Sequence, residues 1–180
     1  MSDRSTAVGG EWPPCAGEAD VRGEAALALS RLRARGWSLG VAESLTGGLL
    51  AAALIGVPGA SDTVRGAIVA YAVPLKHSLL GVEAGLLAAH GAVHPDVALQ
   101  MAEGVRRATA AGGRAADVGI ATTGIAGPDS PDSQPVGTVH LGICTPEGSR
   151  VVSLRLGGDR DEIREATVRH ALRVLVDAAA

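Results

Sequence analysis

The sequence contains no phenylalanine, and aromatic residues make up only 2% of its 180 residues, although apolar residues as a group make up 47%. Its hydrophobic core therefore has to be assembled from alanine, valine, leucine and isoleucine. Such a core is typical of Val/Ile-rich strands that are covered by Ala/Leu-rich helices. A chain of this length buries about two thirds of its unfolded surface, so it can fold without metals or disulfides.

Cysteine is also scarce. Cys15 lies in a polar segment and Cys144 in an apolar one, which argues against a disulfide framework and favours a reducing compartment. No run of about 18 apolar residues is present, and the first residues lack the apolar stretch of a signal peptide. We therefore expect a cytoplasmic protein with no membrane partner.

An excess of positive charge is missing as well. The chain has 16 Lys and Arg residues against 19 Asp and Glu residues, a formal net charge of -3, which disfavours binding to nucleic acids or to an anionic membrane surface. Neither G-x-x-x-x-G-K-[ST] nor G-x-G-x-x-G occurs, which disfavours the common nucleotide-binding loops. The histidines show no metal-binding pair with a supporting carboxylate, so we expect no metal and no other cofactor.

The chain divides into a tail and one domain. Residues 1–18 mix serine, glycine, proline and charge without periodicity and predict a disordered N-terminal tail, whereas residues 19–180 predict a single domain. Apolar residues at helical spacing predict helices at 20–35, 74–80, 83–90, 95–108 and 159–175. An Ala/Leu-rich stretch that ends near residue 55 predicts a further helix. Alternating or continuous apolar residues predict strands at 37–41, 67–71, 118–122, 139–143 and 152–156.

The order of these elements predicts an α/β fold. Helices separate the first three strands, which is typical of a parallel sheet with helices on both faces. The last two strands are joined by a turn at residues 146–148 and should form an antiparallel hairpin. We therefore predict a three-layer α-β-α arrangement with a mostly parallel mixed sheet and a C-terminal antiparallel hairpin.

Residues 41–50 predict a strand that turns directly into a helix. The first N–H groups of such a helix have no intrahelical partner and favour anions or developing negative charge. We expect Ser44 and Thr46 to stand at this mouth, with Gly47 and Gly48 allowing a ligand close to the backbone. Alternatively, one hydroxyl is an ordinary N-cap and the glycines relieve packing.

Polar residues follow three of the predicted strands: Glu43-Ser44, Tyr71 with nearby Lys76, and Thr122-Thr123. Ligands of open α/β sheets bind beyond the carboxyl ends of the strands, so these residues should converge. A lysine that is desolvated enough to be neutral can remove the proton of a nucleophilic serine. The alternative is a solvated surface lysine and a tyrosine whose hydroxyl is simply satisfied at a strand end.

Several motifs occur in a fixed order along the chain. They are A-E-S-x-T-G-G at 42–48, V-P-G-[AS]-S at 57–61, a tyrosine five residues before a lysine at 71 and 76, H-G-A-V at 90–93, T-G-I-A-G-P at 123–128, P-V-G-T-V at 135–139 and G-D-R at 158–160. From about residue 20 to residue 176, the sequence resembles the C-terminal domain family of the competence-damage-inducible protein CinA. Active members of that family are nicotinamide mononucleotide deamidases.

The resemblance implies a metal-free Ser/Lys amidohydrolase of pyridine nucleotide salvage. It would hydrolyse the carboxamide of nicotinamide mononucleotide to nicotinic acid mononucleotide and ammonia. Ser44 would be the nucleophile, Lys76 the general base, and Tyr71 a partner that orients or polarises the pair. Backbone N–H groups near residues 46–48 would stabilise the oxyanion.

The resemblance also suggests which residues bind the small-molecule nucleotide substrate. Arg160 and Arg164 are the candidates for its phosphate, with solvated helix charge as the alternative for both. Family members commonly assemble, so a homo-oligomer is expected. The other expected substrate-binding residues are Glu43, Thr46, Gly47, Gly48, Thr123 and Gly124.

Two segments depart from the family pattern. The family commonly has Ser-Asn-x-x-Lys after the tyrosine, where this chain has residues 72–76 as A-V-P-L-K. The family commonly has paired glycines and a lysine in the loop that here reads D-S-P-D-S-Q at 129–134. A second hypothesis is therefore a nucleotide-binding or regulatory module of the same fold with weak or no turnover.

The catalytic hypothesis requires a lysine with an unusual environment. Lysine with its ordinary pKa near 10.4 is almost wholly charged at pH 7 and cannot accept a proton. Apolar neighbours surround Lys76, and no Asp or Glu lies between Asp62 and Glu83. We therefore expect Lys76 to be desolvated, with a lowered pKa, and Glu43 to point away from it or to be tied up elsewhere.

Overall fold

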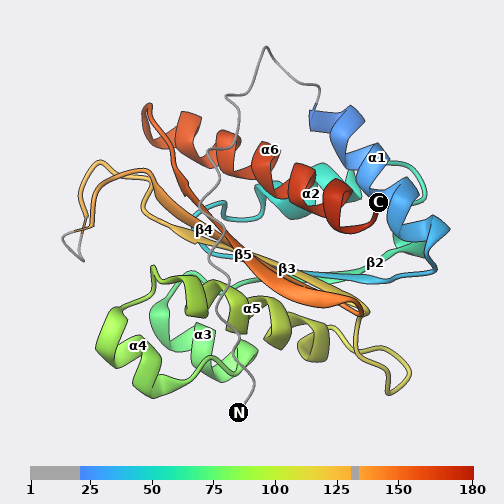
Figure 1. Cartoon of the computed structure of the whole chain (residues 1–180), viewed down its shortest axis with the longest axis horizontal. Helices are drawn as coiled ribbons and strands as arrows, with labels where there is room; N and C mark the ends of the chain where they lie inside the picture. The colour runs from blue at the N-terminus through green and yellow to red at the C-terminus, as the bar shows by residue number, and fades with distance from the viewer. Residues whose placement is uncertain (1–20, 131–133) are drawn as a thin grey trace.

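A computed structural model describes residues 21–130 and 134–180 of the chain (Figure 1). The predicted tail at residues 1–18 lies outside the described residues, as does part of the loop at 129–134. The elements are α1 (Val21–Ala34), β1 (Leu39–Glu43), α2 (Leu49–Ile55), a short 3₁₀ helix (Ala60–Asp62), β2 (Val64–Val69), α3 (Val73–Leu80), α4 (Ala84–His90), α5 (Pro95–Ala108), β3 (Val118–Gly124), β4 (Thr138–Thr145), β5 (Gly148–Arg155) and α6 (Arg160–Ala178).

The strands of the described residues form one five-stranded sheet in the order β2-β1-β3-β4-β5. β1 pairs in parallel with β2 and with β3, while β4 is antiparallel to both β3 and β5. Among the described strands, β4 is thus the one that runs against the rest. The mostly parallel mixed sheet and the C-terminal hairpin predicted from the sequence are confirmed.

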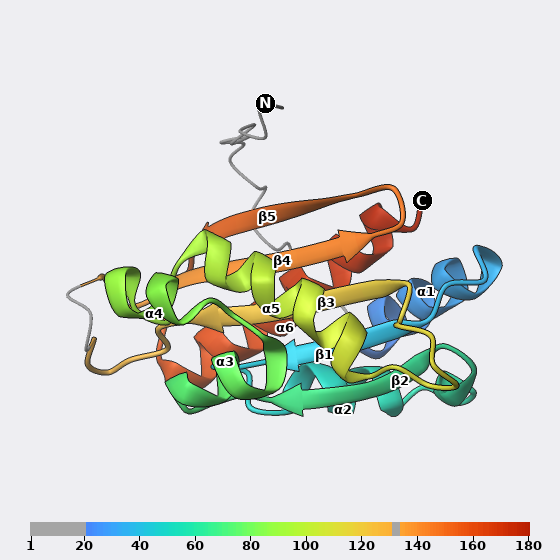
Figure 2. The same ribbon diagram turned by 90° about the horizontal axis from the view of Figure 1, so that it is seen from below.

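Helices cover both faces of the sheet. α1, α2 and α6 lie on one face and α3, α4 and α5 on the other (Figures 1 and 2). Each face has its own apolar cluster, one built around α1, α2 and α6 and the other around α3 and α5. Both clusters consist mainly of alanine, valine, leucine and isoleucine, as the composition predicted. The three-layer prediction is confirmed.

The central strands β1 and β3 are buried on both faces, but β2 is different. β2 is an edge strand whose residues alternate between half-buried and exposed, and Val69 is 43% exposed. The strand predicted at residues 67–71, whose continuous apolar run suggested a buried strand, is therefore wrong in its burial and in its end. At the edge of the sheet, neighbouring elements cover the residues of β2 less fully than they cover those of β1 and β3.

Local sequence signals set several helix starts. The Asp159 side chain accepts hydrogen bonds from the N–H groups of Asp161 and Glu162, and Glu162 bonds back to the N–H of Asp159. This capping box confirms the predicted start of α6. α5 begins at Pro95, as predicted, with the His94 ring accepting from the N–H two residues on.

Two further findings concern cysteine and membranes. Cys144 is buried in β4 as a free thiol, and burial raises its pKa; Cys15 lies outside the described residues. Within residues 21–130 and 134–180, no helix is long and apolar enough to span a bilayer.

Candidate active site

The carboxyl ends of β1, β2 and β3 meet at a cavity of about 320 Å³. The parallel register places the last residue of β1 beside Val69 in β2 and Thr122 in β3. The segments that follow these strands therefore share one edge of the sheet, as predicted. The cavity is lined by Ser44, Leu45, Tyr71, Val73, Lys76, Ala92, Val93, Thr123, Gly124, Ile125, Ala126, Gly127, Asp129 and Arg160.

Ser44 and Lys76 face each other in this cavity. Lys76 Nζ lies 2.9 Å from Ser44 Oγ, a hydrogen-bond distance. Lys76 has no exposed surface, and Ser44 is 8% exposed. The two residues come from the loop after β1 and from α3, so the sheet and one covering helix bring them together. The predicted proximity and the predicted burial of Lys76 are confirmed.

Burial changes the acidity of this lysine. It lowers the pKa of Lys76 from 10.5 to about 8. The cause is desolvation, which disfavours the charged ammonium form. With a pKa of about 8, roughly one lysine in ten is neutral at pH 7 and able to accept a proton.

The backbone of Ala70 links the lysine to the serine strand. The Ala70 N–H donates to the Glu43 carbonyl at 2.8 Å, which extends the pairing of β1 with β2 by one residue. The Ala70 carbonyl accepts a hydrogen bond from Lys76 Nζ at 2.6 Å. The amine is thereby fixed relative to the end of β1. Backbone groups carry no signal in a sequence, which is why this contact was missed.

Glu43 does not face the cavity. Its side chain is fully buried, and its carboxylate accepts hydrogen bonds from the N–H groups of Gly48, Leu50 and Ala51 at 2.9, 3.2 and 2.8 Å. The structure does not bring Glu43, expected as a substrate-binding residue, to the cavity, because the first turn of α2 takes up both carboxylate oxygens. The expectation that it is tied up away from Lys76 is confirmed.

Thr46 and the two glycines also differ from expectation. Thr46 is fully buried, and its Oγ1 lies 2.8 Å from Thr122 Oγ1, so it does not stand at the mouth. The N–H of Gly47 donates to the Ser44 carbonyl, and that of Gly48 to Glu43. The predicted anion site at the start of α2 is filled by the protein itself.

The residues after β3 form the opposite wall. Thr123 and Gly124 both line the cavity, as expected from the strand ends. Thr123 Oγ1 donates to the Ala92 carbonyl at 2.7 Å, which holds the loop before α5 against the end of β3. A side chain at Gly124 would press against the Thr138 carbonyl, so glycine there permits close packing on β4.

Arg160 spans the rim of the cavity. Its Nη1 donates to the Gly127 carbonyl at 2.6 Å, and its Nη2 donates to Tyr71 Oη at 3.3 Å. Tyr71 is 61% exposed, and within the described part of the chain its hydroxyl contacts Arg160 rather than Ser44 or Lys76. The hydrogen bonds of the described residues therefore do not support the expected role of Tyr71 in orienting Ser44 and Lys76.

Arg164, one turn further along α6, reaches a different place. Its Nε donates to the Leu45 carbonyl at 3.0 Å, its Nη2 to the Thr46 carbonyl at 3.4 Å, and its Nη1 pairs with Asp161 at 2.9 Å. Arg164 is not among the residues that line the cavity. Of the two arginines expected at the phosphate, the structure brings only Arg160 to the cavity.

Val73 and Asp129 line the cavity although neither was predicted as a site residue. Val73 presents an apolar side chain where the family pattern has asparagine, and Asp129 adds a carboxylate to the wall. Both lie in the segments that depart from the family pattern, and that departure was the available signal. Among residues 21–130 and 134–180, no three His, Cys, Asp or Glu side chains are grouped so that they could hold a metal ion.

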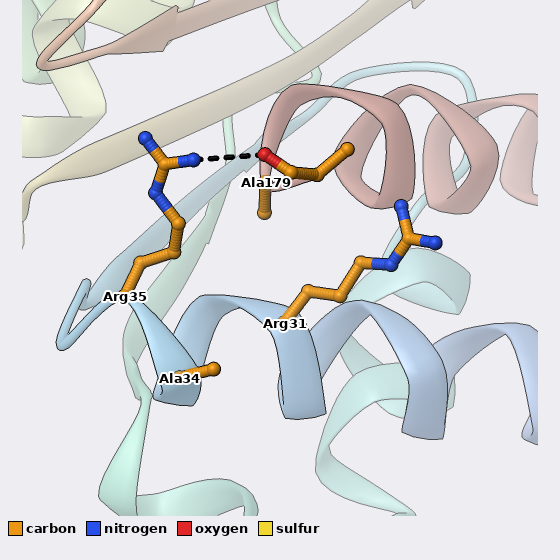
Figure 3. A pocket seen from close by; sticks show the side chains of 5 residues that line it. Arg31, Ala34, Arg35 and Ala179 are labelled. Carbon is orange, nitrogen blue, oxygen red and sulfur yellow. Dashed lines mark hydrogen bonds between the residues drawn. The ribbon is translucent and has the colours of Figure 1, made fainter.

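A second cavity, of about 450 Å³, lies between the C-terminal ends of α1 and α6 (Figure 3). Arg31 and Arg35 line it, and their guanidinium groups donate to the carbonyls of Val176 and Ala180, both at 2.8 Å. Arg35 also pairs with Glu147. These arginines are occupied in closing the end of α6, so the cavity beside Ser44 is the candidate active site.

The sequence matches a known family and curated relatives. The family model described as the CinA C-terminal domain matches residues 23–179. A CinA-like protein of Frankia casuarinae is 50% identical over 146 residues, which are 81% of this chain and 33% of that protein. A putative competence-damage inducible protein of Caldanaerobacter subterraneus is 45% identical over 147 residues, 81% of this chain and 34% of that protein. The chain thus spans about a third of the length of these relatives.

Solved structures agree with this match. A competence-damaged protein (CinA) superfamily protein from Escherichia coli superimposes with a TM-score of 0.84 at 30% identity, covering 92% of this chain and 94% of that one. A competence/damage inducible protein from Agrobacterium tumefaciens gives a TM-score of 0.82 at 36% identity, covering 89% and 96%.

Proposed function

The chain belongs to the CinA C-terminal domain family, and we propose that it is an amidohydrolase that converts nicotinamide mononucleotide to nicotinic acid mononucleotide and ammonia in pyridine nucleotide salvage. The observation that carries this proposal is the 2.9 Å contact of Ser44 Oγ with Lys76 Nζ at a cavity wall, where the lysine pKa is about 8. A buried base in contact with a serine is the arrangement that activates a hydroxyl nucleophile.

The first half of the reaction forms an acyl-enzyme. Neutral Lys76 takes the proton of Ser44 as Oγ attacks the carboxamide carbon, and a tetrahedral intermediate with a negative oxygen results. The Lys76 ammonium then gives its proton to the amide nitrogen, the C–N bond breaks and ammonia leaves. An ester of Ser44 with the pyridine carboxyl group remains.

The second half reverses these roles with water. Lys76, neutral again, takes a proton from a water molecule that attacks the ester carbon. Collapse of the second tetrahedral intermediate breaks the bond to Ser44 Oγ, which regains its proton from Lys76, and the product leaves as a carboxylate after its acid proton passes to solvent. The contact of Nζ with the Ala70 carbonyl supports both halves, because it holds the amine beside Ser44 Oγ, where its lone pair can take the proton.

Arg160 is the candidate for the substrate phosphate in this proposal. Its guanidinium lies at the cavity rim and already donates to two neutral oxygens, those of Gly127 and Tyr71. A phosphate is a stronger acceptor than either oxygen, so a bound nucleotide can displace them. Tyr71 then acts on the orientation of Arg160 rather than on the serine and lysine.

One observation favours the second hypothesis, a nucleotide-binding module with weak turnover. Val73 lines the cavity and is 43% exposed, so an apolar group stands where family members commonly offer an amide. An amide there could hold the substrate or a water molecule, and valine cannot. Under this hypothesis the nucleotide binds without release of ammonia, and Val73→Asn restores turnover.

The deciding experiment measures ammonia and nicotinic acid mononucleotide from nicotinamide mononucleotide with purified protein. We expect turnover by the wild type and none by Ser44→Ala or Lys76→Ala. Ser78→Ala is the matched control, since Ser78 lies on α3 outside the cavity. Equal traces of ammonia from wild type and both dyad variants would reject the enzymatic proposal, and binding without turnover would favour the second hypothesis.

A further inference from the structure

The loop between β1 and α2, residues 44–48, carries the proposed nucleophile and is called here the nucleophile loop. It is held at its α2 end by Glu43. The Glu43 carboxylate accepts hydrogen bonds from the N–H groups of Gly48, Leu50 and Ala51. A residue on β1 therefore holds the first turn of α2 in place. A buried carboxylate with this number of charge-assisted hydrogen bonds is strongly fixed.

Arg164 holds the same loop from α6. Its guanidinium donates to two successive loop carbonyls, those of Leu45 and Thr46, at 3.0 and 3.4 Å. The ion pair with Asp161 at 2.9 Å braces the guanidinium from the other side. Gly47, which follows these two residues, has a φ of 60°, a left-handed conformation that favours glycine in this turn. The loop is therefore clamped between two helices.

This clamping decides where the N–H groups of the loop point. The Ser44 N–H donates to the Thr122 carbonyl at 3.0 Å, the Gly47 N–H to the Ser44 carbonyl at 3.2 Å, and the Gly48 N–H to Glu43. Within residues 21–130 and 134–180, the N–H groups of Leu45 and Thr46 are the two in this loop with no acceptor.

Leu45 is the better placed of these two donors. It lines the cavity beside Ser44, whereas fully buried Thr46 does not. The Leu45 N–H belongs to the same peptide as the Ser44 carbonyl. Because the N–H and C=O of a trans peptide point in opposite directions and this carbonyl is turned to Gly47, the Leu45 N–H points away from Gly47.

We propose that Glu43 and Arg164 are positioning residues that hold the nucleophile loop so that the Leu45 N–H serves as the oxyanion donor. This inference rests on the proposed function of the site as a serine hydrolase. It gives both residues a role that differs from the substrate contacts expected from the sequence. Neither touches the substrate, and both act on the rate of attack by Ser44.

The test uses a probe that needs no knowledge of the substrate. A fluorophosphonate reacts with an activated serine: the Oγ–P bond forms, the P–F bond breaks, fluoride leaves and the serine proton passes through the base to solvent. The tetrahedral phosphorus oxygen needs the same oxyanion donor. We measure the second-order rate constant of labelling of Ser44 for the wild type and for Glu43→Gln, Arg164→Gln and Arg164→Lys, at a temperature where circular dichroism shows each folded.

Two matched controls separate positioning from loss of stability. Glu24→Gln removes a carboxylate that pairs with Arg173 at 2.8 Å between α1 and α6, remote from the loop. Arg169→Gln removes an α6 arginine that pairs with Glu165 at 3.9 Å. Both controls should label within about twofold of the wild type, whereas Glu43→Gln and Arg164→Gln should label at least about tenfold more slowly.

Turnover of nicotinamide mononucleotide gives the second readout. We expect kcat to fall in parallel with the labelling rate while KM stays within about twofold. The midpoint of the pH profile should stay unchanged, because Lys76 is untouched.

Wild-type labelling rates in the folded Arg164 variants would overturn the inference, and intact release of ammonia by the wild type would not rescue it. Absence of turnover with fast wild-type labelling that slows in both variants would reject the proposed substrate and keep the inference. If Glu43→Gln does not fold, the two Arg164 variants decide the test. The Arg164 side chain is partly exposed, so its replacement should leave the protein folded.

Discussion

Gly104 in α5 lies directly against the carbonyl of Leu80, the last residue of α3, so that a Cβ at position 104 would overlap that carbonyl oxygen. α3 also carries Lys76, whose amine must stay within reach of Ser44. The closeness of two helix backbones at a glycine therefore sets the position of the proposed base. Any side chain there has to move α3 as a whole, because backbone atoms and not a flexible side chain are in the way.

Gly104→Ala should destabilise the protein by about 1–3 kcal/mol and lower kcat. Gly85→Ala is the matched control, since Gly85 lies in α4 and a Cβ there meets nothing within 4 Å. That control should change the free energy of unfolding by less than about 1 kcal/mol, on the stabilising side. Urea unfolding and ammonia release check both variants, and equal behaviour of the two would contradict the packing argument.

The rate of turnover should rise with pH through one ionisation near pH 8. The neutral form of Lys76 is the active one, and burial lowers its pKa to about 8, so activity is lost as the lysine gains a proton below that pH. Lys76→Arg should be inactive although the charge is kept, because arginine does not lose its proton in this range. A profile of kcat/KM from pH 6 to pH 10 provides the measurement.

A histidine next to Lys76 offers a control for that profile. His77 is exposed, and its Nδ1 lies 2.8 Å from the Val82 carbonyl. His77→Gln should leave the midpoint near pH 8 in place. A pH profile whose midpoint moves or disappears in His77→Gln would instead remove the main support for lysine as the base.

Arg160→Gln should weaken binding of the nucleotide more than of the nucleoside. Losing one charged hydrogen-bond partner of the phosphate should raise KM for nicotinamide mononucleotide about tenfold. The KM for nicotinamide riboside, which has no phosphate, should change little. Arg150→Gln on β5 is the control, because that arginine does not line the cavity. An equal rise in KM for both substrates would argue against a phosphate contact.

His140 should make the fold sensitive to acid. Burial lowers the pKa of His140 from 6.5 to about 4, with a smaller contribution from His94, and its Nδ1 lies 2.9 Å from Ser153 Oγ. The unfolded chain therefore binds more protons than the folded chain between pH 6.5 and pH 4, and stability falls as the pH drops through that window. The loss attributable to this residue is about 3 kcal/mol.

His140→Gln should flatten this dependence while keeping a partner for Ser153. The free energy of unfolding in urea at pH 7, 5.5 and 4 gives the comparison with the wild type. A residual slope is expected from His170, whose pKa is also lowered by burial. Identical slopes for variant and wild type would show that His140 is not the group that titrates.

The sequence was most informative where a residue acts on its own neighbourhood. Asp159 and Glu162 form a capping box within one helical turn, and Pro95 starts α5 as its own geometry requires. The pairing of Ser44 with Lys76 was also predicted, because both follow strands whose carboxyl ends must share an edge. These predictions depend on local chemistry or on sheet topology, and they do not require the direction of any side chain.

The direction of a side chain could not be predicted in the same way. Arg160 and Arg164 lie four residues apart on α6, and the rotation of the helix against the sheet decides which one reaches the cavity. Glu43 next to Ser44 looked like a cavity residue, but its carboxylate turns to the first turn of α2. The edge position of β2 was hidden as well, because an apolar run does not reveal how many neighbours a strand has.

The backbone of Ala70 has a consequence for how the protein acquires its reactivity. Its N–H binds the end of β1 and its carbonyl binds Lys76, so serine and base come together only when β2 has docked in register beside β1. Parallel pairing joins segments that are distant along the chain and forms late relative to local helices. During refolding, the labelling of Ser44 should therefore recover later than the far-ultraviolet circular dichroism signal of the helices. The rate of that recovery then reports how fast this edge of the sheet assembles.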